Sequence, residues 1–260
     1  MRTIAICNHK GGVGKTAVAM ALAETLHAKG MKTLFVDLDQ QRNATTDTKV
    51  DIAEDDVTVY DLLTSFDYTA KDAIKHYAHG DIIPGDILVA EAEVEISKLD
   101  TSLTMLADAL ESVSEDYDIC IIDCPPSLGL VTRNAMVAAN DIIVVVVPDT
   151  ASIEGFEKIC RVHSSIKRNK HLNPDLVLAG ILINTYDRRG TLDRNADEVF
   201  PRIAESNHTK VFDTRIRKCI AIRKAQSRHM SILDFDARSS AAYDFEALAT
   251  EYLEGVKSNG

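Results

Sequence analysis

The chain of 260 residues lacks tryptophan and has no apolar run near the ~20 residues that a membrane-spanning helix needs. It also lacks low-complexity runs, internal repeats and a linker long enough to separate two domains. We therefore expect residues 1–260 to form a single domain. The N-terminal residues have the pattern of a strand and not of a cleavable leader, which predicts a cytoplasmic protein without a secretory signal.

Cysteine is sparse, odd in number and mostly placed in apolar segments: Cys7, Cys120, Cys124, Cys160 and Cys219. This distribution is typical of reduced thiols and excludes a disulfide framework. Two spacings, Cys120-x-x-x-Cys124 and Cys160-x-x-His163, suggest metal ligands. The first crosses a predicted strand end and the second lacks a further ligand pair, so we interpret these cysteines as small buried apolar residues.

The net charge of −11 argues against nucleic acid as a partner, but the charge is unevenly distributed. Residues 202–228 hold eight lysines and arginines against only Glu205 and Asp213. Screening limits repulsion from distant carboxylates to about 8–10 Å. A local basic patch on this acidic chain is therefore still able to bind phosphates.

Residues 7–16, with the sequence CNHKGGVGKT, organise the chain. They lie between a predicted strand at residues 3–7 and a predicted helix at residues 16–29. The glycines let backbone amides approach an anion, and the helix N-terminus adds partial positive charge. In such a loop Lys15 reaches the β- and γ-phosphates of a nucleotide and Thr16 binds Mg²⁺. A simple glycine turn does not explain two lysines and a threonine at these spacings.

The first glycine of the standard phosphate-binding motif is replaced by His9, and an additional lysine, Lys10, follows it. This loop resembles the deviant Walker A loop of the ParA/MinD family of P-loop ATPases. The resemblance implies that Lys10 is a catalytic residue that reaches the nucleotide of a second subunit across a dimer interface. It also implies that ATP contacts the run Lys10, Gly11, Gly12, Val13, Gly14, Lys15, Thr16 and Ala17. Ala17 replaces a threonine of many relatives, but its backbone N–H remains.

Two further segments are similar to motifs of the same family. A strand at residues 32–37 leads into DLDQQRNAT, where Gln40 and Arg42 replace the family's proline and glycine. The resemblance makes Asp39 the carboxylate that orients the attacking water; the alternative is a residue that caps a turn. The apolar strand before DCPPS ends at Asp123, where a Walker B carboxylate lies beside Mg²⁺.

The remaining pattern alternates strands and helices, with buried strands predicted at residues 141–148 and 176–183. Helical spacing is found at Leu99, Leu103, Leu106 and Leu110. We predict an α/β fold, a doubly wound and mostly parallel sheet with helices on both faces. The nucleotide site is expected at the carboxyl ends of the strands.

Asn184 follows the last predicted strand, where relatives use an asparagine to pair with adenine; capping a turn is the alternative. In the family segment near residue 217 a proline shapes the adenine pocket, and here Arg217 replaces it. By resemblance to DNA-segregating relatives, we expect non-specific DNA contacts from Arg188, Arg189, Arg215, Arg217, Lys218 and Arg223; the alternative is an ordinary solvated surface. The C-terminal helix is acidic and should be repelled by anionic lipid, so no membrane partner is expected.

The resemblance implies an Mg²⁺-dependent ATPase of plasmid or chromosome partition that is cytoplasmic and associated with the nucleoid. ATP would form a homodimer that binds DNA, and a centromere-binding ParB-type protein would stimulate hydrolysis. No N-terminal helix-turn-helix domain is expected. Two alternatives stay open: a relative that positions a protein cargo, and a metallocluster carrier, which would need an accessible cysteine pair.

Overall fold

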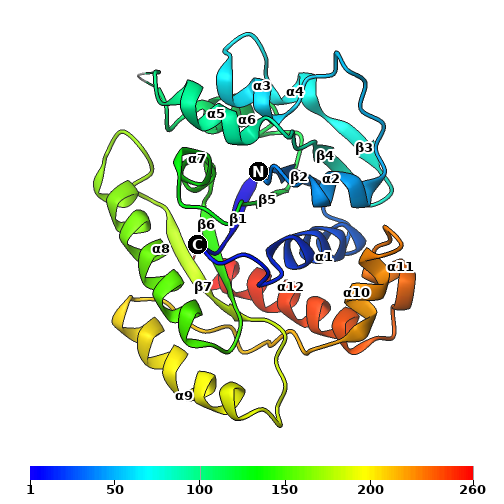
Figure 1. Ribbon diagram of the computed structural model, residues 1–260, viewed down its shortest axis with the longest axis vertical. Helices are drawn as coiled ribbons and strands as arrows, with labels where there is room; N and C mark the ends of the chain where they lie inside the picture. The colour runs from blue at the N-terminus through cyan, green and yellow to red at the C-terminus, as the bar shows by residue number, and fades with distance from the viewer. Residues whose placement is uncertain (100, 260) are drawn as a thin grey trace.

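The computed structural model describes residues 1–99 and 101–259. Its described strands form one sheet in the order β3-β4-β2-β5-β1-β6-β7, parallel except for β3, which pairs antiparallel with β4 (Figure 1). The strands are β1 (Arg2–Cys7), β2 (Thr33–Asp37), β3 (Lys75–Tyr77), β4 (Gly80–Ile83), β5 (Ile119–Asp123), β6 (Asp141–Val146) and β7 (Val177–Ile183). The mostly parallel sheet confirms the predicted fold class.

Helices cover both faces of the sheet because its central strands are apolar on both sides. One face carries α3 (Val59–Thr64), α4 (Ala70–Ala73), α5 (Val89–Ile96), α6 (Met105–Glu111), α7 (Leu130–Ala138), α8 (Thr150–Arg168) and α9 (Thr191–Ser206). The other carries α1 (Lys15–Ala28), α2 (Asn43–Thr48), α10 (Ile220–Gln226), α11 (Ile232–Asp236) and α12 (Ser240–Asn259). The core is therefore divided into two apolar clusters, one on each side of the sheet.

The helical spacing from Leu99 to Leu110 is only partly a helix. Helix α6 begins at Met105, and the described residues before it form turns. Two i→i+3 backbone hydrogen bonds close these turns, from Ser102 N to Leu99 O at 3.2 Å and from Thr104 N to Thr101 O at 2.9 Å. Successive turns bring every third or fourth side chain to the same side, so Leu99 and Leu103 reach the core without a continuous helix.

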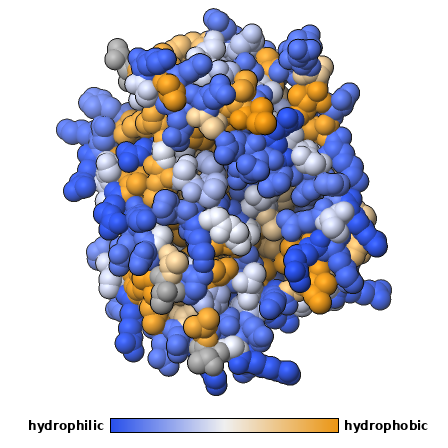
Figure 2. All heavy atoms as spheres, in the orientation of Figure 1, coloured by the Kyte–Doolittle hydropathy of each residue, from blue (hydrophilic) through white to orange (hydrophobic). Residues whose placement is uncertain are grey.

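Helix α12 packs along α1 through Phe245, Leu248 and Tyr252, which are buried. The apolar side of α12 is therefore buried in the core. None of the helices in the described ranges is long and apolar enough to cross a membrane. Figure 2 shows polar side chains over most of the visible face, with apolar ones in small separate groups.

Candidate functional site

The residues predicted to bind a nucleotide meet at the carboxyl ends of the parallel strands. Strand β1 leads into the phosphate-binding loop, residues 8–15, and its neighbour β5 ends at Asp123. Asp37 at the end of β2 lies in register with Asp123. This edge of a doubly wound sheet is where ligands bind in such folds.

Gly14 is the N-cap of α1 and has a left-handed backbone, with φ at 87°. A Cβ at this position would lie 2.4 Å from Nδ2 of Asn184, so both the backbone angle and the close approach require glycine. The first turn of α1 contains no acidic residue. The amides at the start of this 14-residue helix are thus available to an anion, as the motif predicts.

Asn184 lies directly beside the phosphate-binding loop. Its Nδ2 donates to the carbonyl of Val13 at 2.7 Å, and its Oδ1 accepts from the Thr185 amide at 2.8 Å. The side chain is buried and both ends of its amide contact backbone. The geometry gives Asn184 a role in holding the loop, while its pairing with adenine stays a prediction.

Asp37 and Asp123 form a buried pair of carboxylates at the ends of adjacent strands. Asp37 accepts hydrogen bonds from the amide and hydroxyl of Thr45, at 2.9 and 2.8 Å, yet burial raises its pKa to about 6. Burial and the neighbouring Asp37 raise the pKa of Asp123 well above its usual range. The Thr16 hydroxyl and Lys15 ammonium oppose this shift, but neither oxygen of Asp123 has a hydrogen-bond donor among the described residues.

Two buried carboxylate oxygens without a donor, close to the Thr16 hydroxyl, form a set of hard oxygen ligands. Mg²⁺ prefers such ligands and usually completes its shell with phosphate oxygens and water. The residues present therefore fit Mg²⁺ bound together with a nucleotide.

Asp39 lies in the loop between β2 and α2, and is mostly buried. Its Oδ1 accepts from the Gln41 amide at 3.0 Å, and its own amide donates to Asp37 at 3.2 Å. Arg42, at the end of the same loop, is the N-cap of α2, and its φ of 52° is left-handed. A glycine at this position would adopt the angle without strain.

The two lysines of the phosphate-binding loop have different surroundings. Lys15 is buried, and its Nζ lies 3.4 Å from the Lys10 carbonyl. Lys10 forms an ion pair with Asp149, the N-cap residue of α8. Burial opposes ionisation of Asp149, but Lys10 and the Ser152 amide outweigh it and lower the pKa of Asp149. The sequence reasoning missed this partner, because nothing local marks a residue that lies 139 positions from Lys10.

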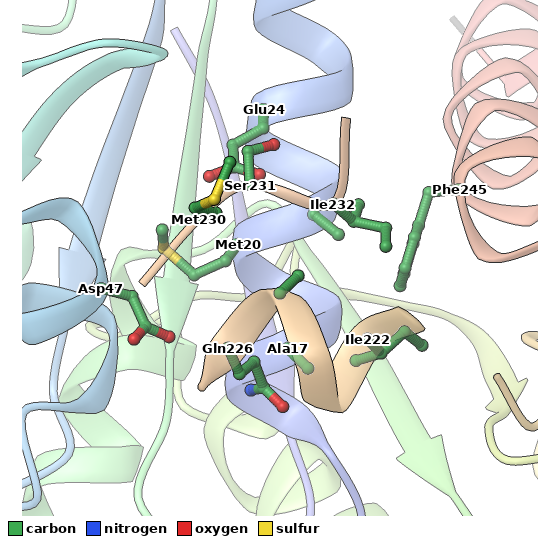
Figure 3. A pocket seen from close by; sticks show the side chains of 12 residues that line it. Ala17, Met20, Glu24, Asp47, Ile222, Gln226, Met230, Ser231, Ile232 and Phe245 are labelled. Carbon is green, nitrogen blue, oxygen red and sulfur yellow. The ribbon is translucent and has the colours of Figure 1, made fainter. Parts of the chain in front are cut away.

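The helix that follows the phosphate-binding loop borders a small cavity of about 40 Å³ between α1 and the α10–α11 segment. Ala17 lines this cavity at the end near the loop, and Glu24 lies at the other end beside Ser231 (Figure 3). Glu24 is buried, which raises its pKa to about 7. Helix α10, which carries Arg223, thus faces the nucleotide-side helix across this cavity.

The predicted DNA contacts divide into two groups. Arg188, Arg189, Lys218 and Arg223 are exposed. Arg215, in contrast, donates to the Phe212 carbonyl and lies 3.5 Å from Asp197. The side chain of Arg217 is also exposed, but its guanidinium is bound to Asp244 at 2.7 Å.

Four of the five cysteines are buried, namely Cys7, Cys120, Cys124 and Cys160. The Sγ atoms of Cys7 and Cys124 are 3.4 Å apart in the strand ends below the loop. Cys120 and Cys124, the pair weighed as cluster ligands, are fully inaccessible. Within the described ranges no three His, Cys, Asp or Glu side chains are grouped so that they could hold a metal ion by themselves.

The fold and this site define a P-loop nucleotide-binding protein. A family model described as an AAA domain matches residues 1–178. The sporulation initiation inhibitor protein Soj of Bacillus subtilis is 35% identical, over 100% of this chain and 99% of its own. The chromosome partitioning protein ParA of Caulobacter vibrioides is 31% identical, over 97% and 94%.

Among solved structures, cobyrinic acid a,c-diamide synthase from Mycobacterium smegmatis with a bound ATP analogue and magnesium superposes with a TM-score of 0.84. It is 29% identical and covers 100% of this chain and 97% of its own. The chain belongs to the ParA/MinD family of P-loop ATPases, and its full-length relatives include Soj and the chromosome partitioning protein ParA.

Proposed function

We propose that this protein is an Mg²⁺-dependent ATPase of plasmid or chromosome partition. The observation that supports it most directly is that Lys10, Lys15, Asp39 and Asp123 all lie at one edge of the sheet, in a chain related over its full length to partition proteins. The related synthase binds an ATP analogue and magnesium in the same fold, which supports ATP and Mg²⁺ as the cofactors here.

The amides of residues 11–17 and the Lys15 ammonium would bind the phosphates of ATP. Thr16 and Asp123 would hold Mg²⁺, which neutralises charge that develops on the phosphates during transfer. Asp39 would accept a proton from, or orient, the attacking water. Lys15 lies within the loop and is already directed along it toward Lys10.

Lys10 makes the active site depend on a second copy of this chain. In this proposal Lys10 leaves Asp149 and reaches the nucleotide of the opposite subunit, where its charge stabilises the transferred phosphoryl group. The site is then complete only in a dimer. Hydrolysis removes the phosphate that both subunits hold, so the dimer dissociates.

The exposed residues Arg188, Arg189, Lys218 and Arg223 are the leading candidates for DNA contact. Their positive charges would neutralise phosphates without reading bases, which suits non-specific binding to the nucleoid. Arg215 and Arg217 are secondary candidates because carboxylates of the same chain already pair with them. A centromere-binding ParB-type protein is the proposed partner that stimulates hydrolysis.

The proposal is tested by measuring binding of a labelled random-sequence duplex with ATP, with ADP and without nucleotide. We expect binding only with ATP, and loss of that binding in Lys15→Ala, which cannot hold the phosphates. Removing Lys218 and Arg223 together should lower the log–log salt slope by about 0.9 for each DNA phosphate that is no longer neutralised. Equal binding in all three nucleotide conditions would contradict the proposed switch.

A further inference from the structure

A second basic site lies outside the nucleotide-binding machinery. A cleft of about 400 Å³ runs between α7 and α8, close to the start of the phosphate-binding loop. Arg133 of α7 and Lys158 and Arg161 of α8 line it, together with His9. Leu128 and Val162 supply apolar walls. This volume is within the range of small-molecule sites, roughly 300–1,000 Å³.

The cations of this cleft have no carboxylate partner among the described residues, unlike three other arginines of the chain. Arg2, Arg215 and Arg217 each pair with an aspartate. Within residues 1–99 and 101–259, by contrast, Lys158 and Arg161 make no side-chain hydrogen bond or ion pair. The one hydrogen bond of the Arg133 side chain in the same ranges is a long one, from Nε to the Leu128 carbonyl at 3.4 Å.

Like charges gathered in one recess repel each other, and this recess contains no carboxylate from the described residues. Glu154 and Glu157 lie on the same helix but are exposed and do not line the cleft. His9 adds an imidazole whose Nδ1 is buried without a hydrogen-bond partner in the described part of the chain. An anionic ligand would neutralise the cations of this cleft.

We propose that the cleft between α7 and α8 binds a small polyphosphorylated molecule. Arginine presents a planar fork of donors that matches phosphate oxygens, and lysine adds a point charge. Three cations within one cleft match adjacent phosphate groups, which concentrate several negative charges in a small volume. A nucleic-acid backbone has one charge per roughly 3.4 Å of each strand, and so it suits an extended surface better than a recess.

The cleft is connected to the nucleotide site through close packing of α8 on the loop. A Cβ at Gly155 of α8 would lie 3.1 Å from Asn8 Oδ1 and 3.9 Å from the His9 Cβ. Asn8 Oδ1 in turn accepts from the Lys10 amide at 2.8 Å. A ligand held by Lys158, Arg161 and His9 would therefore contact the segment that positions Lys10.

The test uses the full chain with its phosphate-binding loop saturated by Mg²⁺ and ADP, so that the added anion does not enter that site. Inorganic tripolyphosphate is titrated in and heat is measured by calorimetry. We expect one bound tripolyphosphate per chain, and about tenfold weaker binding in Lys158→Gln and in Arg161→Gln, since each removes charge-assisted hydrogen bonds. Lys98→Gln, an exposed residue elsewhere, is the charge-matched control and should bind as the parent does.

Absence of binding to the ADP-saturated protein would overturn the proposal, as would binding that both variants leave unchanged. Binding of nucleic acid to the same cleft is tested by adding a random-sequence duplex as a competitor of tripolyphosphate. Suppose that the duplex displaces tripolyphosphate and that Lys158→Gln weakens binding of the duplex as much as binding of tripolyphosphate. The cleft then binds the backbone of a nucleic acid, and the proposal of a small ligand is wrong. No DNA switching or hydrolysis enters this measurement, so its result is independent of the proposed partition function.

Discussion

Arg217 binds Asp244 through both its backbone and its side chain. The amide donates to Oδ2 at 2.9 Å, and the guanidinium Nη2 donates to Oδ1 at 2.7 Å. The side chain of Asp244 is only 10% exposed, so it depends on these donors. A proline at position 217 would have no amide hydrogen to donate. The arginine found there supplies Asp244 of α12 with both an amide and a guanidinium donor.

We expect Arg217→Gln to lower the free energy of unfolding by about 1–2 kcal/mol, because it leaves the buried Asp244 carboxylate with fewer donors. Urea denaturation measures this. Lys218→Gln, its exposed neighbour, should change the free energy of unfolding by less than about 0.5 kcal/mol. If Arg217→Gln instead lowers the salt slope of DNA binding as strongly as Lys218→Gln does, the main role of Arg217 is contact with DNA.

The ion pair of Lys10 with Asp149 leads to opposite expectations for its two members. Lys10→Ala should abolish dimerisation with ATP, as measured by light scattering, because the charge that crosses to the other subunit is gone. Asp149→Asn should favour the dimer by up to about fivefold, since a partly exposed ion pair contributes roughly 0.2–1 kcal/mol. Asparagine keeps the N-cap of α8, which Asp149→Ala would lose as well. A Lys10→Ala protein that dimerises normally would rule out the cross-subunit role.

Asp39→Ala should bind ATP and duplex DNA normally but hydrolyse ATP about 10²–10⁴-fold more slowly, because the attacking water is no longer oriented. Phosphate release and duplex binding are measured on the same preparation. Gln41→Ala, in the same loop, is a control for disturbance of the backbone. Hydrolysis at the parent rate would assign Asp39 to capping of the turn.

Arg42→Gly should stabilise the protein by about 1 kcal/mol, because a left-handed angle strains every residue except glycine by roughly 1–2 kcal/mol. Thermal and urea unfolding measure the gain. Arg42→Ala separates the causes, because it removes the long side chain, including its buried and unpaired Nε, but keeps the strain. Equal gains in the two variants would show that the side chain, and not the backbone angle, is the source.

Glu24 should make the protein less stable as the pH rises. Burial raises the pKa of its carboxyl from 4.5 to about 7 in the folded chain, so the folded state binds the proton more tightly than the unfolded state. The stability that Glu24 contributes is fully present below 4.5, the pKa of its carboxyl in the unfolded chain, and is lost as the pH rises through about 7.

Glu24→Gln should therefore be more stable than the parent at pH 8, by up to about 3 kcal/mol, and similar near pH 5. Urea denaturation at the two pH values gives the difference, with Glu111→Gln, an exposed glutamate, as the control. A difference that is the same at both pH values would show that Glu24 keeps its charge in the folded protein.

The sequence alone was sufficient for the parallel sheet and for bringing the predicted nucleotide-binding residues to one edge of it. Strand β6 is apolar from Ile142 to Val146, and β5 is apolar up to Asp123 at its end, so the position of Asp123 at the sheet edge follows from the pattern. The glycines and lysines of residues 8–15 are adjacent in the chain, and local spacing therefore identifies them. The helical spacing from Leu99 to Leu110 correctly marked residues that pack in the core, although only Met105–Glu111 of this stretch is a helix, because consecutive turns produce similar spacing.

What the tertiary structure decided is which charges have partners. The partners lie far apart in the chain: Lys10 pairs with Asp149, Arg217 pairs with Asp244, and the uncharged Asn184 binds the Val13 carbonyl. Periodicity gives no information on such pairs. The structure also separated the predicted basic residues into those that pair with a carboxylate and those that do not, and assembled Arg133, Lys158 and His9 from three segments into one cleft. Spacing along a chain reports burial, but ion pairing depends on which helices the sheet brings together.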